Sequence, residues 1–274
     1  MNTLGFFPKG KFVEISITGH KCPLNCPMCG GKWLRGMKPA KSPEELVLLA
    51  KHLREQGVKG ILVSGGLDKR GKLPIRPFEW ALREMKKMGL FISVHTGVVD
   101  REEATILSRV DVDLADYELI LDRNAIHKSK GLHLRPEDFI RGMELLLENG
   151  IEVVPHVTVG LPGSSNRWIK LASDIISELE IRRSVVLAFI PTPGTPLEGE
   201  DSPKIEDIVE SVGIMKKSSR VSLGCMRPPW LKEKLDIKLL GIVDRIANPH
   251  PHLNIKKVNA CCSIPDRLIE EFMM

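Results

Sequence analysis

The chain has 274 residues, of which 42% are hydrophobic and 27% are charged, and its formal net charge is +5. This balance is typical of a folded globular protein. It excludes a disordered chain, a collagen-like chain and a coiled coil, and the charge is too small to indicate nucleic-acid binding. No segment approaches the roughly 18 consecutive apolar residues of a membrane span, and residues 1–11 contain no apolar signal-peptide core. We therefore expect a cytoplasmic protein that has neither a membrane nor a nucleic acid as its partner.

Short β-branched segments alternate with amphipathic helical patterns along the chain. In chain order, strands are predicted at residues 12–18, 60–64, 91–95, 114–121, 152–159, 185–190, 220–224 and 256–260. Helices are predicted at residues 42–56, 77–88, 101–109, 136–148, 167–179, 205–217, 235–246 and 265–272. The first helix has clear boundary signals, because Ser42 suits an N-cap, Pro43 suits the first helical position and Gly57 suits the C-terminal end.

Strands that are each followed by a helix of about a dozen residues imply βαβ units and a parallel sheet. Eight such units predict an α/β fold, a (β/α)8 barrel of the TIM type. We expect it to occupy residues 1–274 as one domain, because no linker rich in Pro, Gly and Ser divides the chain. A partial, open barrel and an open, doubly wound sheet are the alternatives. In such barrels the chemistry lies at the C-terminal ends of the strands.

Three of the six cysteines follow the first predicted strand with the spacing C-x3-C-x2-C, namely Cys22, Cys26 and Cys29. Close thiolates on one loop suit a soft metal or an iron–sulfur cluster. Three local ligands leave one iron of a [4Fe–4S] cluster open for a substrate or cofactor, as open positions do at other catalytic metals. A structural zinc site with His20 as a further ligand, and three unrelated buried thiols, are the alternatives.

This motif on the loop after the first strand resembles that of the radical S-adenosylmethionine (SAM) superfamily. The resemblance implies that Cys22, Cys26 and Cys29 hold a [4Fe–4S] cluster, whose open iron chelates the amino and carboxylate groups of SAM. It also implies that one electron cleaves SAM to methionine and a 5′-deoxyadenosyl radical, which abstracts a hydrogen atom from the substrate. Met28 departs from the family pattern, which usually has an aromatic residue before the last cysteine.

Other strand ends resemble the segments with which the family binds SAM. Gly65 and Gly66 match a Gly-Gly-Glu segment that contacts the amino group of SAM, with the acidic residue displaced to Asp68, although an ordinary βα turn is the alternative. Asp122 falls where related enzymes contact the ribose, and a helix N-cap is the alternative there. The resemblance also implies three contacts to adenine from the end of the fifth strand: Val159, Gly160 and Leu161.

The other three cysteines end the last two predicted strands, Cys225 in Gly-Cys-Met-Arg-Pro and Cys261 and Cys262 in Cys-Cys-Ser. In a closed barrel these strands are neighbours, so the three thiols would meet and form a second metal site, a candidate auxiliary Fe–S cluster. Such a cluster needs a fourth ligand, for which Ser263, Arg227 or a partner group is the candidate. Two adjacent cysteines rarely bind one cluster without strain, and buried free cysteine is the alternative.

The same two segments resemble the archaeal two-protein lipoyl synthase, whose subunits look distantly like biotin synthase. Biotin synthase itself is disfavoured, because it carries its second cluster on cysteines of the third, fourth and fifth strands and this chain has none there. The resemblance implies a sulfurtransferase of lipoate biosynthesis that inserts sulfur into an unactivated C–H bond of a protein-bound octanoyl chain. The implied partners are an octanoylated lipoyl carrier protein or peptide, a second radical SAM subunit and an electron donor such as ferredoxin.

Residues 123–135 are basic, and lipoyl carrier domains are generally acidic, so this segment is a candidate docking surface. A solvated basic loop is the alternative. Two other functions stay open, because fold and cofactor site are shared across many reactions. One is a radical enzyme of another class, such as a methylornithine synthase-like mutase without sulfur insertion. The other is a non-catalytic iron–sulfur or zinc protein.

Overall fold

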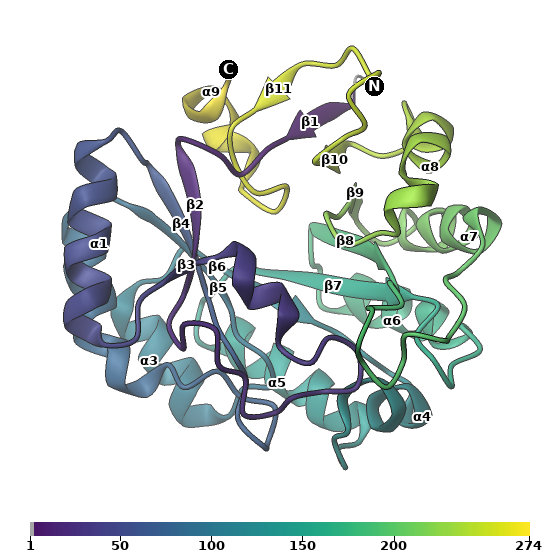
Figure 1. The fold of residues 1–274 in the computed structure, drawn as a ribbon, viewed down its shortest axis with the longest axis horizontal. Coiled ribbons are helices and arrows are strands. Elements are labelled where there is room, and N and C mark those ends of the chain that lie inside the picture. Colours follow the sequence, from purple (N-terminus) through teal and green to yellow (C-terminus); the bar gives the residue numbers. More distant parts are fainter. Residues whose placement is uncertain (1–2) are drawn as a thin grey trace.

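One parallel sheet of eleven strands runs through residues 3–274, the part of the chain that the computed structural model describes (Figure 1). The strands are β1 (Leu4–Phe6), β2 (Phe12–Ser16), β3 (Lys38–Pro39), β4 (Gly60–Ser64), β5 (Phe91–His95), β6 (Leu114–Glu118), β7 (Val153–Val159), β8 (Arg183–Ala188), β9 (Arg220–Leu223), β10 (Arg245–Ala247) and β11 (Lys257–Val258). Their order across the sheet is β11-β1-β10-β9-β8-β7-β6-β5-β4-β2-β3. Because β11 and β3 are edges, the predicted α/β barrel class is confirmed in its open form.

Helices cover the outer side of the curled sheet (Figure 1). The α-helices are α1 (Pro43–Glu55), α2 (Glu79–Lys87), α3 (Arg101–Val110), α4 (Arg123–Ala125), α5 (Pro136–Glu148), α6 (Trp168–Glu178), α7 (Ile205–Met215), α8 (Lys232–Leu239) and α9 (Ile269–Phe272). Five short 3-10 or π segments accompany them: η1 (Lys32–Gly36), η2 (Arg76–Phe78), η3 (Ile126–Lys130), η4 (Pro229–Leu231) and η5 (Asp266–Leu268). The predicted N-cap is confirmed, since Ser42 Oγ accepts a hydrogen bond from the backbone N–H of Glu45 at 3.2 Å. Among the described helices, none combines the length and apolar character that crossing a bilayer requires.

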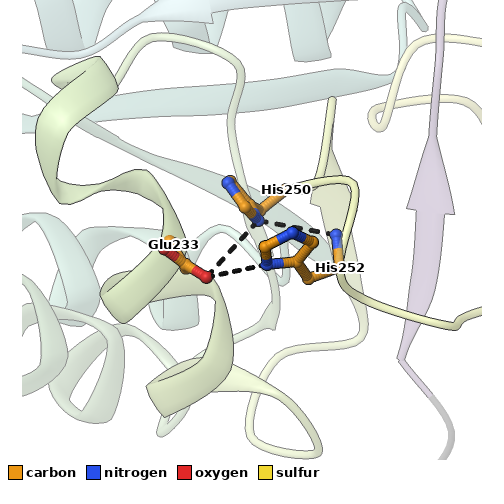
Figure 2. Close-up of side chains that lie close together, drawn as sticks. All are labelled: Glu233, His250 and His252. Carbon is orange, nitrogen blue, oxygen red and sulfur yellow. Dashed lines mark hydrogen bonds and ion pairs between the residues drawn. The ribbon is translucent and has the colours of Figure 1, made fainter.

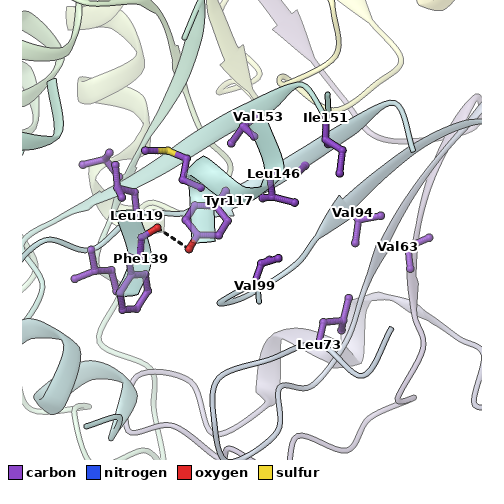
Figure 3. Packing of buried hydrophobic residues seen from close by; sticks show 14 of the residues in the cluster. Val63, Leu73, Val94, Val99, Tyr117, Leu119, Phe139, Leu146, Ile151 and Val153 are labelled. Atoms are coloured by element: carbon purple, nitrogen blue, oxygen red, sulfur yellow. Dashed lines mark hydrogen bonds between the residues drawn. The ribbon is translucent and has the colours of Figure 1, made fainter. Parts of the chain in front are cut away.

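The outer face of the sheet packs against these helices through an apolar core (Figure 3). Side chains from neighbouring strands, among them Val63, Val94 and Tyr117, belong to one apolar cluster with Phe139 and Leu146 of α5. The fully buried Tyr117 donates its hydroxyl to the carbonyl of Phe139 at 2.8 Å, which satisfies its polar end. Gly142 in α5 leaves space for this phenol, because a Cβ there would lie 2.4 Å from the Tyr117 oxygen. This side of the sheet is therefore structural.

The inner face of the sheet has an apolar and a polar layer. Toward the N-terminal ends of the strands, Phe12, Phe91 and Leu114 form a second apolar core with Ile264 and Phe272 from the end of the chain. Further along the same face, strand register aligns five polar residues, called the polar layer below: Ser93, His95, Asp116, Glu118 and His156. These side chains point away from the helices, since the alternate residues, such as Tyr117, belong to the outer core.

Two predicted elements near the C-terminus are wrong. The helix expected at residues 235–246 begins at Lys232 and ends at Leu239, and residues 245–247 form β10. Gly241 has φ +77°, a conformation that ends the helix where the hydrophobic pattern continues. The strand expected at residues 256–260 is reduced to the two residues of β11, because β10 and β1 occupy the positions beside β9.

Candidate functional site

The loop with the first three cysteines, residues 17–31, follows β2 and is held from two sides. The backbone N–H of Leu24 donates to the carbonyl of Leu67, after β4, at 2.8 Å. The backbone N–H of Met28 donates to the carbonyl of Ser129, in the π-helix η3, at 3.0 Å. The loop is thus fixed at the C-terminal ends of the strands, where the fold places catalytic groups.

Gly66, after β4, makes room for this loop. A Cβ on Gly66 would lie 2.1 Å from the carbonyl oxygen of Lys21 and 2.4 Å from the Cα of Cys22. Because both neighbours are backbone atoms, they cannot turn aside as a flexible side chain would. Gly66 also donates its N–H to Thr18 Oγ1 at 2.6 Å. Gly66 therefore allows the cysteine loop to approach the end of β4, and the contact of Gly65 and Gly66 to SAM stays a prediction.

Within the loop, Cys26 and Cys29 bring their sulfur atoms within 3.5 Å of each other, while Cys22 Sγ lies 4.0 Å from the carbonyl of Leu67. The hydrogen bond from Cys29 and the positive charge of Lys130 lower the pKa of Cys26 to about 6. The same hydrogen bond raises the pKa of Cys29, because Cys29 keeps the shared proton. Three cysteines on one loop, one of them with a lowered pKa, provide the sulfur ligands that a cluster requires. Within residues 3–274 the three thiols do not all lie within 4.8 Å of one another, and His20 does not join them in a closer group, so their spacing is wider than a single zinc ion needs.

Lys130 is a functional candidate that sequence reasoning missed. It ends η3, its side chain is 8% exposed, and its Nζ lies 2.6 Å from Glu118 Oε2 in the polar layer. An ammonium group has three donors, so the Glu118 contact leaves others for a ligand beside the cluster loop. π-Helical turns are rare and often mark functional sites, but the sequence pattern showed only a basic stretch. With Lys130 buried, the docking surface predicted over residues 123–135 loses one of its charges.

The polar layer contains polar groups without partners. Asp116 is 3% exposed, and neither of its carboxylate oxygens has a hydrogen-bond partner, nor has the hydroxyl of buried Ser93. His156 Nε2 lies 3.8 Å from Asp116 Oδ1, and its Nδ1 lies 3.0 Å from the carbonyl of Val154. The ring of His95 is 5.8 Å from that of His156, and burial lowers the pKa of His95. Both histidines share the inner face with the Asp116 carboxylate, which has no hydrogen-bond partner.

The three remaining cysteines converge on the inner side of the sheet. Cys262 is buried and its hydrogen bond with Cys261 raises its pKa well above the usual value. Cys225 is exposed as a residue, but its thiol is desolvated by surrounding protein, which raises its pKa to about 12, and the nearby Cys261 adds to this shift. Cys262 packs in the inner apolar core with Leu114 and Val154, which precede Asp116 and His156 on the same face of their strands, so this second group adjoins the polar layer. The sequence predicted the convergence, but the route differs, because residues 259–264 cross the inner face instead of forming a barrel strand.

Of the proposed fourth ligands for this group, the structure favours Ser263. Its hydroxyl is buried and lies 3.1 Å from Cys261 Sγ. Arg227 is committed elsewhere, since its guanidinium pairs with both carboxylate oxygens of Asp236 at 2.8 and 2.9 Å and donates to the carbonyls of Gly224 and Ala247. Ser263 is therefore the candidate with a free position beside the thiols.

The other predicted SAM contacts have local structural roles. Asp68 accepts from the backbone N–H groups of Arg70 and Lys72 in its own turn. Asp122 caps α4 by accepting from the N–H of Ala125 at 2.9 Å. Gly160 has φ +76°, and a Cβ there would lie 2.6 Å from Pro203. Two further residues are buried in the outer core, Val159 and Leu161. Their side chains face the helices, so a contact to adenine would come from the backbone, and it stays a prediction.

Residues 16–175 match the radical SAM superfamily, and the chain belongs to this family. Members use a [4Fe–4S] cluster together with SAM. The residues of the first loop fit such a cluster, because three cysteines, two of them with their sulfur atoms within 3.5 Å, lie on one loop beside a buried cation. The protein is accordingly a radical SAM enzyme.

Similar proteins differ in their reactions. The chain is 23% identical over 231 residues to a tRNA-2-methylthio-N(6)-dimethylallyladenosine synthase of Caldicellulosiruptor saccharolyticus, covering 75% of this chain and 49% of that protein. It is 24% identical over 247 residues to the ribosomal protein uS12 methylthiotransferase RimO of Aeromonas hydrophila, covering 82% and 54%. The chain thus spans about half the length of these relatives. Methylornithine synthase has a similar fold, with a TM-score of 0.64, 16% identity and coverage of 94% of this chain and 75% of that one.

Proposed function

We propose that this enzyme inserts sulfur into an unactivated C–H bond, and that its substrate is an octanoyl chain on a lipoyl carrier protein in lipoate biosynthesis. The observation that carries the proposal is the second cysteine group, Cys225, Cys261 and Cys262, which adjoins the polar layer on the inner face. A sulfur source must lie beside the carbon that is attacked. The two methylthiotransferases among the similar proteins support transfer of sulfur as the reaction type.

Each cysteine group has its own part in this proposal. When bound, the cluster and SAM supply a carbon radical that abstracts hydrogen from an unactivated C–H bond. The cluster is held by Cys22, Cys26 and Cys29. The ammonium group of the buried Lys130 pairs with the carboxylate of SAM. On the other side of the polar layer, Cys225, Cys261, Cys262 and Ser263 hold an auxiliary cluster as the sulfur source. The substrate then lies along the polar layer between the two groups.

Partners follow from the same proposal. The carrier protein docks at the C-terminal ends of the strands, where the exposed basic side chains of residues 123–135 favour an acidic surface. Reduction requires an electron donor such as a ferredoxin, and a second radical SAM subunit completes the two insertions that one lipoyl group needs. We propose that the enzyme works in the reducing cytoplasm, where cysteine thiols stay free to bind clusters.

A second candidate is a radical rearrangement without sulfur insertion, as in a methylornithine synthase-like mutase. The observation that favours it is the unpartnered Asp116 beside His156. A desolvated carboxylate binds a substrate ammonium group better than an aliphatic chain. Under this alternative the polar layer holds an amino-acid-type substrate, and the second cysteine group has no part in the reaction.

Iron content and product mass separate the two candidates. Sulfur insertion predicts about eight iron atoms per anaerobically reconstituted chain, and a single cluster predicts about four. The variants Cys225→Ala, Cys261→Ala and Cys262→Ala, whose new side chains cannot bind iron, should lose half of the iron and all sulfur transfer, while SAM cleavage remains. The assay uses an octanoyl carrier peptide, with and without partner proteins, and reads each added sulfur by mass. Four iron atoms in the unmodified chain, with no sulfur added, would exclude sulfur insertion.

A further inference from the structure

A cluster of metal-ligand side chains that contains no cysteine lies between α8 and the loop after β10 (Figure 2). Glu233 Oε1 is 2.9 Å from His252 Nδ1 and 4.0 Å from His250 Nδ1. Within residues 3–274, this is the one group of three His, Cys, Asp or Glu side chains whose ligand atoms all lie within 4.8 Å of each other. We propose that Glu233, His250 and His252 bind a divalent transition-metal ion of the zinc class. The proposal goes beyond the radical chemistry and does not depend on it.

The observed separations suit one ion. A tetrahedral ion with bonds of about 2.0–2.1 Å holds its ligand atoms about 3.3–3.4 Å apart. The two measured separations from Glu233 lie on either side of this value, at 2.9 and 4.0 Å. Side-chain rotations that move each atom by less than an ångström therefore complete the site, without any change in the backbone.

The donor set determines the kind of ion. Two imidazole nitrogens and one carboxylate oxygen suit zinc, nickel, copper or cobalt, whereas magnesium and calcium prefer oxygen ligands. Three protein ligands leave a position for water. Because the side chains of His252 and Glu233 are 75% and 49% exposed, the ion exchanges with solvent.

The loop that carries both histidines is rigid before any ion binds. Pro249 and Pro251 flank His250 and fix φ on either side of it. The backbone N–H of His250 donates to Asp236 Oδ2 at 2.8 Å, and its carbonyl accepts from Leu253 at 3.0 Å. Little conformational entropy is therefore lost when the imidazoles bind an ion.

An ion here would join two segments next to the second cysteine group. Arg227 follows Cys225 by two residues, pairs with Asp236 of α8 at 2.8 Å, and donates to the carbonyl of Asn248 at 3.3 Å. Glu233 lies on α8, and the histidines follow Asn248. Metal binding thus links α8 to the loop after Asn248, the two segments that Arg227 contacts. It thereby stabilises the segment that carries Cys225.

The test uses the chain with its iron–sulfur sites reconstituted under anaerobic conditions, so that the thiols are occupied. Zn²⁺ is titrated by equilibrium dialysis, with zinc and iron measured together, and carbon-13-labelled histidine rings are followed by NMR. We expect one zinc ion per chain in addition to the iron, with ring signals shifting at His250 and His252. Glu233→Gln and His252→Ala should each weaken binding at least tenfold. His133→Ala is the matched control, because His127 and His133 also pair, at 5.0 Å between rings, without a third ligand close by in the described chain.

Three results would each overturn the proposal. In the first, the unmodified chain, His133→Ala and Glu233→Gln all bind the same amount of zinc. In the second, zinc binds with unchanged affinity in both site variants. In the third, zinc shifts histidine rings other than those of His250 and His252. Melting temperatures of the metal-free variants should equal that of the unmodified chain, since all three changes lie at the surface.

Discussion

The buried ion pair of Lys130 and Glu118 links the first cysteine loop to the polar layer. Their side chains are 8% and 15% exposed, and the Nζ–Oε2 distance is 2.6 Å. Removing one partner of such a pair leaves an uncompensated buried charge, which costs about 3–5 kcal/mol, whereas replacing both by apolar groups is often neutral. The pair is therefore expected to be retained for ligand binding and not for stability.

Lys130→Met should lower the free energy of unfolding by about 3 kcal/mol, and the double variant Lys130→Met/Glu118→Leu should lie within about 1 kcal/mol of the unmodified chain. Both should bind SAM weakly. Urea unfolding of the cluster-free protein measures the first effect, and equilibrium binding to the reconstituted protein measures the second. The exposed pair of Lys238 and Glu206 provides the control, because Lys238→Met should change stability by no more than about 0.5 kcal/mol. Equal effects at the two lysines would contradict the importance of burial.

Asp116 should show a conflict between stability and function. Its unpartnered, desolvated carboxylate is costly to the folded state. Asp116→Asn removes the charge and lets the new amide donate toward His156 Nε2, so we expect the protein to become more stable by about 1–2 kcal/mol while turnover falls strongly. Thermal unfolding and product formation are measured on the same preparations. A variant that is less stable yet fully active would show that the carboxylate is structural.

At the scale of elements, the turn after β4 decides whether the cysteine loop can close. Gly66→Ala places a Cβ against backbone atoms of Lys21 and Cys22. We expect the variant to fold but to lose the iron of the first cluster and, with it, SAM cleavage, because the loop is displaced. Gly199→Ala is the control, since nothing lies within 4 Å of the added carbon. Iron per reconstituted chain is the measurement. Full iron content in Gly66→Ala would show that the cysteine loop does not need the close contact between Gly66 and the backbone of Lys21 and Cys22.

The elements differ in how far sequence predicts them. Apart from the two-residue β3, the strands from β2 to β9 have four to seven residues and alternate with helices of clear periodicity, so their order was predictable. β1, β10 and β11 have two or three residues each, too few for a pattern, and they pair over long sequence distances. The site divides in the same way. Closely spaced cysteines identify their own loop, whereas burial of Lys130 depends on Glu118, twelve positions earlier in the chain.

At the scale of the whole molecule, both ends of the chain complete the sheet. β1 lies between β10 and β11 (Figure 1). Asn259 Oδ1 accepts from the N–H groups of Lys9 and Lys11 at 3.2 Å, and Lys11 Nζ donates to the carbonyl of Met273 at 3.0 Å. The last residues therefore close the inner apolar core and position Cys261 and Cys262.

Phe272, although close to the C-terminus, should behave as a central core residue. It is 1% exposed, and its ring lies 6.1 Å from that of Phe12. Phe272→Ala should lower the free energy of unfolding by about 3–5 kcal/mol, because it leaves a cavity in the inner apolar core. Met274→Ala, two residues further on and 72% exposed, should change stability by less than about 0.5 kcal/mol. Denaturant unfolding measures both. If the two substitutions cost the same, the C-terminal segment is not part of the core, and the second cysteine group would lose its fixed position beside the polar layer.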